Sequence, residues 1–126
     1  MSKKTVVLGA SLKTERYSNI ATKRLVKYGH EVVPIGLRTG TIAGINIQKG
    51  EPSLEDIDTL TLYLNPKRQK ALYDYILGLE PKRIIFNPGT ENPDLIQLAQ
   101  AKGIETEIAC TLVMLATDVY LSLIHI

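Results

Sequence analysis

The chain has 126 residues, which is the length of a single domain with a buried core. With 44% hydrophobic and 22% charged residues, its composition is that of a globular protein and excludes a disordered or fibrous chain. The formal net charge is only +2 and the basic residues occur in short groups, which argues against nucleic acid as a partner. The single cysteine excludes an intrachain disulfide and fits a reducing compartment.

No part of the sequence is typical of a membrane span or a secretory signal. The apolar run that begins at Val6 is short and is broken by the polar loop at Ser11. No segment approaches the roughly 18 uninterrupted apolar residues that a membrane span needs. We therefore expect a cytoplasmic protein with no membrane partner.

The first predicted element is a strand at residues 5–9, which leads into a turn made by Gly9, Ala10 and Ser11. Glycine lets the backbone turn sharply and come close to a ligand. The hydroxyl and backbone N–H of Ser11, together with the amino-terminal end of the next helix, suit a phosphate group. The Gly-x-Gly-x-x-Gly pattern of dinucleotide sites is missing, because no second or third glycine follows Gly9.

A basic loop takes the place of those glycines. It contains Lys13 and Arg16 and ends at Ser18, the expected cap of a helix over residues 19–28. Gly29 is a natural stop signal for that helix. A longer, basic loop suits a wide or doubly charged phosphate group better than a closely packed pyrophosphate.

The second predicted strand, residues 31–35, runs through Pro34 and Ile35 to Gly36 and is followed by Arg38. NAD-binding folds usually have an acidic residue here, which binds the ribose 2′-hydroxyl. This chain has an arginine, whose planar guanidinium pairs well with phosphate. The pattern favours a nucleotide with an extra ribose phosphate, which leaves CoA and NADP. The alternative is that Arg38 is only a solvated surface residue.

The rest of the chain alternates between strands and helices. Residues 37–58 are predicted to be an irregular connection, and loops of this length often carry function. Strands are predicted at residues 59–64, 83–86 and 105–108, and helices begin after Asn65 and Asn92. This alternation predicts a single α/β domain of Rossmann-like type, with a doubly wound, mostly parallel five-stranded sheet and helices on both faces.

Ligands of such sheets bind beyond the carboxyl ends of the strands, where the strand order reverses. The turn at Gly9, the ends of the second and third strands and the end of the fourth strand at Asn87-Pro88-Gly89 should therefore share one rim. At that rim Tyr63 or Ile35 could pack against an adenine ring, although a core position explains Tyr63 equally well. Asn65 is explained as a helix cap, with or without a ligand contact.

Five segments together resemble the small stand-alone CoA-binding proteins, which are similar to the CoA-binding domain of the succinyl-CoA synthetase alpha subunit. In chain order the segments are Gly9-Ala-Ser with Arg16-Tyr17-Ser18-Asn19 and then Gly29–Gly36, Ala43-Gly44 with residues 52–57, residues 62–66, residues 86–92 and residues 104–110. Their order and spacing make residues 1–117 the expected CoA-binding domain. A tail of uncertain status at residues 118–126 lies outside the resemblance. Its apolar part, residues 121–126, is open to three interpretations: an extra strand, a partner-facing segment, or an unnatural or truncated end.

The resemblance and the residue arguments together imply a site for CoA or an acyl-CoA. Its expected residues are Gly9, Ala10, Ser11, Leu12, Arg16, Tyr17, Ser18, Pro34, Ile35, Gly36, Arg38, Tyr63, Leu64 and Asn65.

Candidates for catalysis are few. His30 is interpreted as a surface or edge residue, and Glu91 and Asp94 flank a helix start, where the helix dipole favours acids. Cys110 is interpreted as a buried reduced thiol, and no His/Cys cluster has metal-ligand spacing. In succinyl-CoA synthetases a histidine of a later domain carries the phosphoryl group, so the resemblance implies binding without that chemistry.

The leading hypothesis is a CoA-binding protein that is non-catalytic or regulatory. One alternative is an NADP-dependent oxidoreductase, and another is a partner-binding module with a vestigial nucleotide site. The expected partner is a small-molecule nucleotide. Association as a homodimer or with a partner protein is left open.

Overall fold

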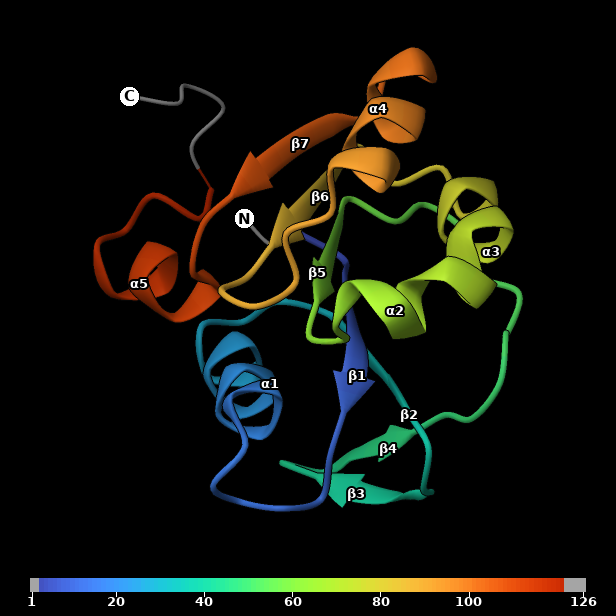
Figure 1. Ribbon diagram of the computed structural model, residues 1–126. Helices are drawn as coiled ribbons and strands as arrows, with labels where there is room; N and C mark the ends of the chain where they lie inside the picture. Colours follow the sequence, from blue (N-terminus) through green and yellow to red (C-terminus); the bar gives the residue numbers. More distant parts are fainter. Residues whose placement is uncertain (1–2, 122–126) are drawn as a thin grey trace.

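The computed structural model describes residues 3–121 (Figure 1). Its elements are, in chain order, β1 (Thr5–Ala10), α1 (Tyr17–Lys27), β2 (Val32–Gly36), β3 (Gly40–Ile42), β4 (Ile45–Ile47), β5 (Thr59–Leu62), α2 (Pro66–Gln69), a 3-10 turn (Lys70–Leu72), α3 (Tyr73–Gly78), β6 (Arg83–Phe86), α4 (Pro93–Ala101), β7 (Glu105–Ile108) and α5 (Thr111–Ala116).

Five of the strands form one parallel sheet in the order β2-β1-β5-β6-β7. The chain first places β2 on one side of β1 and then places β5, β6 and β7 on the other. The strand order therefore reverses between β1 and β5. The prediction of a doubly wound, five-stranded parallel sheet is confirmed.

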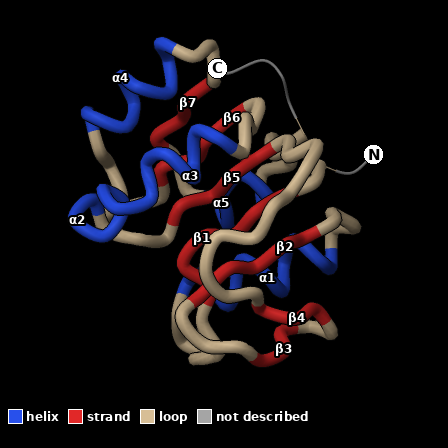
Figure 2. Tube along the Cα trace, turned by 90° about the vertical axis from the view of Figure 1, so that its right-hand side faces the viewer, coloured by secondary structure: helices blue, strands red, loops and turns tan. Residues whose placement is uncertain are grey.

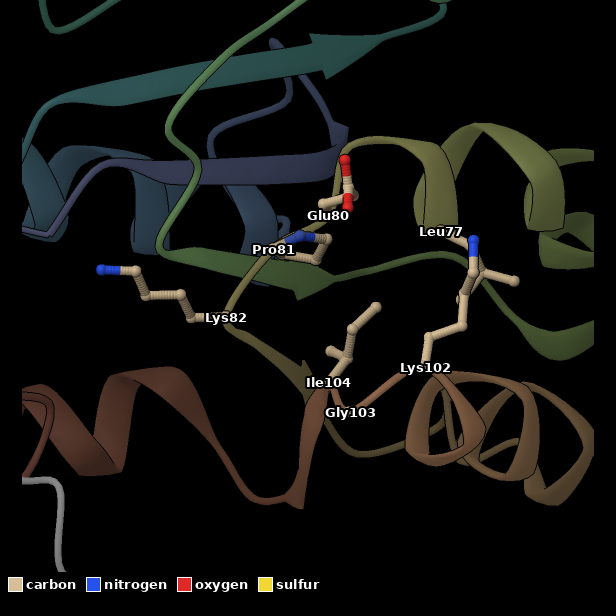
Figure 3. Close-up of a pocket in the computed structure, with 7 residues that line it drawn as sticks. All are labelled: Leu77, Glu80, Pro81, Lys82, Lys102, Gly103 and Ile104. Atoms are coloured by element: carbon tan, nitrogen blue, oxygen red, sulfur yellow. The ribbon is translucent and has the colours of Figure 1, made fainter.

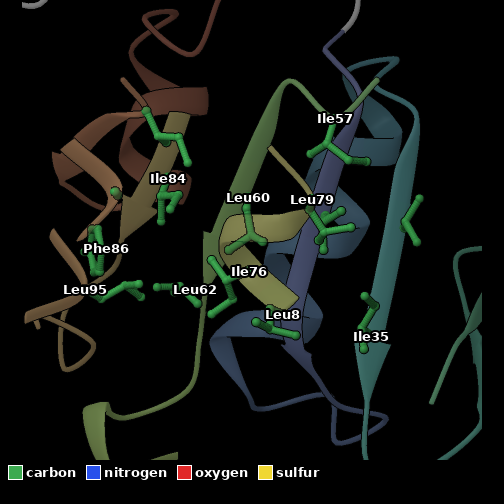
Figure 4. Close-up of a cluster of buried hydrophobic side chains, with 14 residues drawn as sticks. Leu8, Ile35, Ile57, Leu60, Leu62, Ile76, Leu79, Ile84, Phe86 and Leu95 are labelled. Atoms are coloured by element: carbon green, nitrogen blue, oxygen red, sulfur yellow. The ribbon is translucent and has the colours of Figure 1, made fainter. Parts of the chain in front are cut away.

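Each face of the sheet buries its own apolar cluster. One cluster lies under α3 and α4 and includes Leu60, Ile76 and Leu95, all of which are fully buried (Figure 4). The other lies under α1 and α5 and includes Val7 and Leu25. Figure 1 shows α1 and α5 on one side of the sheet and α2, α3 and α4 on the other. Two covered faces explain why β1 and β6 are mostly apolar and why both the leucines and the threonines of β5 are buried.

The predicted irregular connection contains a β-hairpin. β3 and β4 pair antiparallel, and Ala43 (φ 50°) and Gly44 (φ 81°) form the turn between them. Two successive positive φ values are the geometry of the commonest two-residue hairpin turn. Ile42 and Ile47 are buried, so the hairpin is anchored through one face. Figure 2 shows it beside the carboxyl ends of β1 and β2.

Arg83 is buried at the amino-terminal end of the sheet, with 3% of its surface exposed. Lys82-Arg83 is one of the short basic groups, which a sequence pattern alone would place in solvent, and for Arg83 that expectation is wrong. Its Nε donates to Thr59 Oγ1 at 2.7 Å, and its Nη2 donates to the carbonyl of Tyr120 at 2.7 Å. Its Nη1 lies 3.4 Å from Glu107 Oε2. A buried guanidinium is tolerated because these acceptors satisfy it.

Tyr120 closes the same end of the sheet. Its ring lies under the Arg83 guanidinium, 4.4 Å from the centroid, and its hydroxyl is 2.8 Å from Thr5 Oγ1. Thr5 Oγ1 donates to the carbonyl of Lys3 at 3.0 Å, so the Tyr120 hydroxyl is the donor in the Thr5–Tyr120 pair. The tail expected at residues 118–126 thus contributes Tyr120 to the core, whereas residues 122–126 lie outside the described part of the chain.

We expect Tyr120→Phe to lower the free energy of unfolding by about 1 kcal/mol, because one buried hydrogen bond is lost while Thr5 keeps its own acceptor. Urea denaturation measures the loss. Tyr28→Phe is the matched control, since the Tyr28 side chain is exposed. Equal stability of the two variants would show that the Tyr120 hydroxyl contributes nothing.

His30 packs against this group and is buried, which corrects its interpretation as a surface residue. Its Nδ1 accepts from the backbone N–H of Lys3 at 2.9 Å, and its ring centroid lies 4.9 Å from that of Tyr120. Burial, and then the positive charges of Arg83 and Lys3, lower the pKa of His30 below its ordinary value of 6.5. The folded protein therefore favours the neutral imidazole, in which Nδ1 can accept the hydrogen bond from Lys3.

A pH dependence of stability follows from the lowered pKa of His30. Below about pH 6.5 the unfolded chain binds a proton at His30 that the folded chain does not. The free energy of unfolding should fall as the pH drops from 7.5 to 5.5, measured by urea denaturation. His30→Asn keeps an acceptor for Lys3 without a titrating ring, and we expect it to show a smaller fall. An equal fall in both proteins would exclude His30 as the cause.

Candidate functional site

The carboxyl ends of β1, β2 and β5 meet where the strand order reverses, which is the usual ligand position in this architecture. Three close approaches bring their loops together. A Cβ built on Gly9 would lie 3.0 Å from the carbonyl carbon and oxygen of Tyr63, a Cβ on Gly36 would lie 2.3 Å from the carbonyl oxygen of Ala10, and a Cβ on Gly40 would lie 2.7 Å from the side chain of Leu12. The predicted common rim is therefore present.

The loop between β1 and α1, residues 11–16, is held by hydrogen bonds within itself; we call it the Ser11 loop. Ser11 Oγ accepts from the N–H of Lys13 at 3.1 Å, and the Lys13 carbonyl accepts from the N–H of Arg16 at 3.1 Å. Because Ser11 Oγ acts as an acceptor inside the loop, its proton is left for another acceptor. Residues 12–16 are exposed.

Helix α1 begins without a side-chain cap. The expected cap at Ser18 is wrong, because the helix starts at Tyr17 and Arg16 occupies the cap position with no capping hydrogen bond from its side chain. Ser18 is buried in the first turn instead. The first-turn N–H groups therefore have no side-chain acceptor at the positive end of the helix dipole, an arrangement that suits an anion.

Gly9 and Gly36 are needed for the packing of the strands. Gly9 has φ +104° at a register shift in β1, and its missing side chain makes room for the backbone of Tyr63. Gly36 pairs with Ala10 and makes room for its carbonyl. The structure thus explains both glycines by close approach of protein backbone, where the sequence interpretation assigned Gly9 to approach of a ligand.

The end of β2 divides into buried and exposed residues. Pro34 and Ile35 are buried, and Ile35 belongs to the core cluster under α3 and α4. An adenine ring therefore cannot stack on Ile35 as the residues are packed. Arg38 is exposed in the connection to the hairpin, two residues before Gly40, which the Leu12 side chain covers. Arg38 and the Ser11 loop consequently flank the same edge.

Tyr63 packs against the apolar cluster under α1 and α5, so the core interpretation of this residue fits its contacts. Its hydroxyl is buried and has no hydrogen-bond partner in the described residues, and burial raises its pKa. Leu64 is half-buried. Asn65 is the cap of α2, where its Oδ1 accepts from the N–H of Arg68 at 2.9 Å.

Two buried amide side chains, those of Gln69 and Asn87, connect the rim loops. Gln69 Nε2 donates to the carbonyls of Leu64 (2.7 Å) and Thr90 (2.9 Å), which ties the loop after β5 to the loop after β6. Asn87 Oδ1 accepts from the N–H of Thr111 at 2.9 Å, which ties the loop after β6 to α5. Asn87 stands at a predicted strand end, whereas nothing in the sequence marks Gln69.

The candidates for catalysis lie in the loops after β6 and β7 and at the start of α4. Glu91 Oε1 accepts from the N–H of Gly89 at 2.8 Å, and Asp94 lies in the first turn of α4. Cys110 is half-buried and precedes α5. Within residues 3–121 there is no group of three or more His, Cys, Asp or Glu side chains that could hold a metal ion.

A hollow of about 290 Å³ lies at the opposite end of the sheet from this rim (Figure 3). It is lined by Leu77, Glu80, Pro81, Lys82, Lys102, Gly103 and Ile104. These residues precede β6 and β7, at the amino-terminal ends of the strands.

In the described part of the chain, no helix is long and apolar enough to cross a membrane.

Comparisons with known proteins agree with this architecture. A crystal structure described only as that of an uncharacterized protein is 48% identical, with a TM-score of 0.92, and the match covers 95% of this chain and 99% of that one. A protein from Thermus thermophilus is 19% identical (TM-score 0.82, 94% and 91% covered), and a hypothetical protein from Pyrococcus horikoshii is 22% identical (TM-score 0.81, 94% and 84% covered). These two show the fold alone.

No curated protein matches the chain with significance. The sequence model of one protein family, described as a CoA binding domain, matches residues 3–116, which is nearly the whole chain. That match agrees with the doubly wound sheet and with the uncapped, basic start of α1 at the reversal of strand order. The chain therefore belongs to the CoA binding domain family.

Proposed function

We propose that this protein holds CoA or an acyl-CoA at the carboxyl ends of β1, β2 and β5 and acts as a binding or regulatory module without chemistry of its own. The observation that carries the proposal is the start of α1. Its amide groups have no side-chain cap, and they follow a loop with Lys13 and Arg16 exposed. A phosphate group supplies the negative charge that this end of a helix favours.

Each part of the ligand has a matching part of the rim. The N–H and hydroxyl of Ser11, the first turn of α1 and Arg16 would hold the pyrophosphate. Arg38 would pair with the ribose 3′-phosphate. Leu12 and Tyr17 are 42% and 71% exposed beside these charges, so they offer apolar surface to the adenine or the pantetheine arm.

The other predicted site residues support this rim from behind. Ala10, Ser18, Pro34 and Ile35 are buried, so in the proposal they position the loops and do not contact the ligand. Gly9 and Gly36 allow the strands to approach, and Tyr63, Leu64 and Asn65 shape the end of β5.

The proposal of binding without catalysis rests on what the candidate groups already do. Glu91 accepts a hydrogen bond in its own turn, and His30 accepts one at the far end of the sheet. NADP shares an extra ribose phosphate with CoA and is the competing ligand. Arg38 alone does not distinguish the two.

Thermal unfolding with added ligand tests the proposal. CoA at about 100 times its dissociation constant should stabilise the protein by about 2.7 kcal/mol, and NADP at the same concentration should give a much smaller shift. Mass spectrometry of ligand released from the purified protein identifies what it carries. A shift with NADP alone would favour the oxidoreductase alternative, and no shift with either nucleotide would leave the partner-binding alternative.

A further inference from the structure

Asn19 lies in the first turn of α1 directly behind the Ser11 loop, with 2% of its surface exposed. Its Nδ2 donates to the carbonyl oxygen of Ser11 at 2.8 Å, across eight residues of the chain. The backbone N–H of Asn19 donates to the carbonyl of Arg16 at 3.1 Å. One residue therefore connects both ends of the Ser11 loop to the helix.

The side-chain oxygen of Asn19 has no hydrogen-bond partner among the described residues. The other buried amide side chains use theirs. Gln69 Oε1 accepts from Asn92, Asn87 Oδ1 accepts from Thr111, and Asn92 Oδ1 accepts from Leu95. A buried amide oxygen that accepts no hydrogen bond is uncommon in a folded protein and calls for a local explanation. Its place behind the Ser11 loop links it to the anion site at the start of α1.

We propose that Asn19 is the positioning residue of this site: its Nδ2 holds the Ser11 carbonyl so that the loop presents its N–H groups to the phosphates. This inference rests on the proposed function, because it assigns a role within the same CoA site. The Ser11 carbonyl and the Leu12 N–H belong to the same planar peptide unit. Fixing the direction of the carbonyl therefore also fixes the direction of the Leu12 N–H.

Isothermal titration with CoA at low and high salt tests the inference. Asn19→Leu has a similar volume and removes the donor, and we expect it to weaken CoA binding about tenfold or more. Because the lost contacts are to phosphates, the salt dependence of binding should also become shallower. A residue that only stabilised α1 would leave the salt dependence unchanged.

Thr22→Val is the matched control. Thr22 Oγ1 donates to the carbonyl of Ser18 at 2.8 Å, so this change breaks a buried side-chain-to-backbone bond in the same helix without touching the Ser11 loop. We expect the wild-type affinity and salt dependence. Should Asn19→Leu fail to fold, Asn19→Asp preserves the size and removes the donor, and the same weakening is expected.

The outcomes separate the two proposals. If the wild type does not bind CoA, the proposed function fails. If the wild type binds CoA and a folded Asn19 variant binds it with the same affinity and salt dependence, only the role of Asn19 is overturned. An equal loss in Thr22→Val would likewise overturn it, because the effect would then belong to α1 as a whole.

Discussion

Gly36→Ala should destabilise the protein by about 3 kcal/mol, near the upper end of what an overpacked site costs. The added Cβ would lie 2.3 Å from the carbonyl oxygen of Ala10 on the paired strand. Real side chains do not approach a backbone oxygen so closely, so β1 and β2 would have to move apart at the point where the Ser11 loop begins. Urea denaturation measures the loss of stability.

Gly78→Ala is the control for this substitution. Gly78 is the last residue of α3, and a Cβ added there meets nothing within 4 Å. Alanine favours the helix over glycine, so a gain of about 0.5–1 kcal/mol is expected. Equal stability of wild type and Gly36→Ala would contradict the close packing of β1 against β2.

Arg38→Ala should weaken CoA binding by about 1.5–3 kcal/mol, the range for a hydrogen bond to a charged group. The expectation depends on Arg38 pairing with the ribose 3′-phosphate. Dephospho-CoA lacks that group, so wild type and Arg38→Ala should bind it almost equally. Titration calorimetry with both ligands measures the difference.

Arg24→Ala is the matched control, since Arg24 is an exposed arginine in the last turn of α1, away from the rim. It removes the same charge, so it reports any effect of net charge alone. A full loss with dephospho-CoA would place Arg38 at another part of the ligand. The same loss of CoA affinity in Arg24→Ala would show that the effect comes from the change in net charge and not from a specific contact of Arg38.

Most of the central sheet could be predicted from the sequence because its signals are local. The apolar strand β6 ends at Phe86, and the Asn92-Pro93 pair marks the start of α4 with the asparagine as its cap. Buried parallel strands and capped helices of this kind are determined by neighbouring residues. The predicted bounds of β6 and β7 agree with the structure, β1 and β5 differ by one and two residues at their carboxyl ends, and β2 is shifted by one residue at both ends.

The missed features depend on partners far away in the sequence. Arg83 is buried because Thr59 and the carbonyl of Tyr120 accept its hydrogen bonds, and no local pattern announces either partner. The hairpin strands β3 and β4 have only three residues each and mix glycine and polar residues with isoleucine, so their alternation was too short to recognise.

The candidate site divides in the same way. The basic loop and the charge of Arg38 could be predicted from residue types alone. Recognising an exposed charge requires no knowledge of the tertiary contacts around it. The burial of Ile35, the packing role of Gly9 and the amide contact of Asn19 depend on how strands and loops meet in space. The position of the rim therefore follows from the sequence, whereas the packing contacts of Gly9 and Ile35 follow only from the structure.

Amide hydrogen exchange with and without CoA tests most directly whether the ligand lies at the carboxyl ends of β1, β2 and β5. Binding there should slow exchange at residues 11–18, at residues 36–40 and at residues 63–65, while the residues lining the hollow before β6 and β7 exchange as in the free protein. Slowed exchange at Lys82 and Lys102, with none at the Ser11 loop, would contradict the account and move the ligand to the opposite end of the sheet.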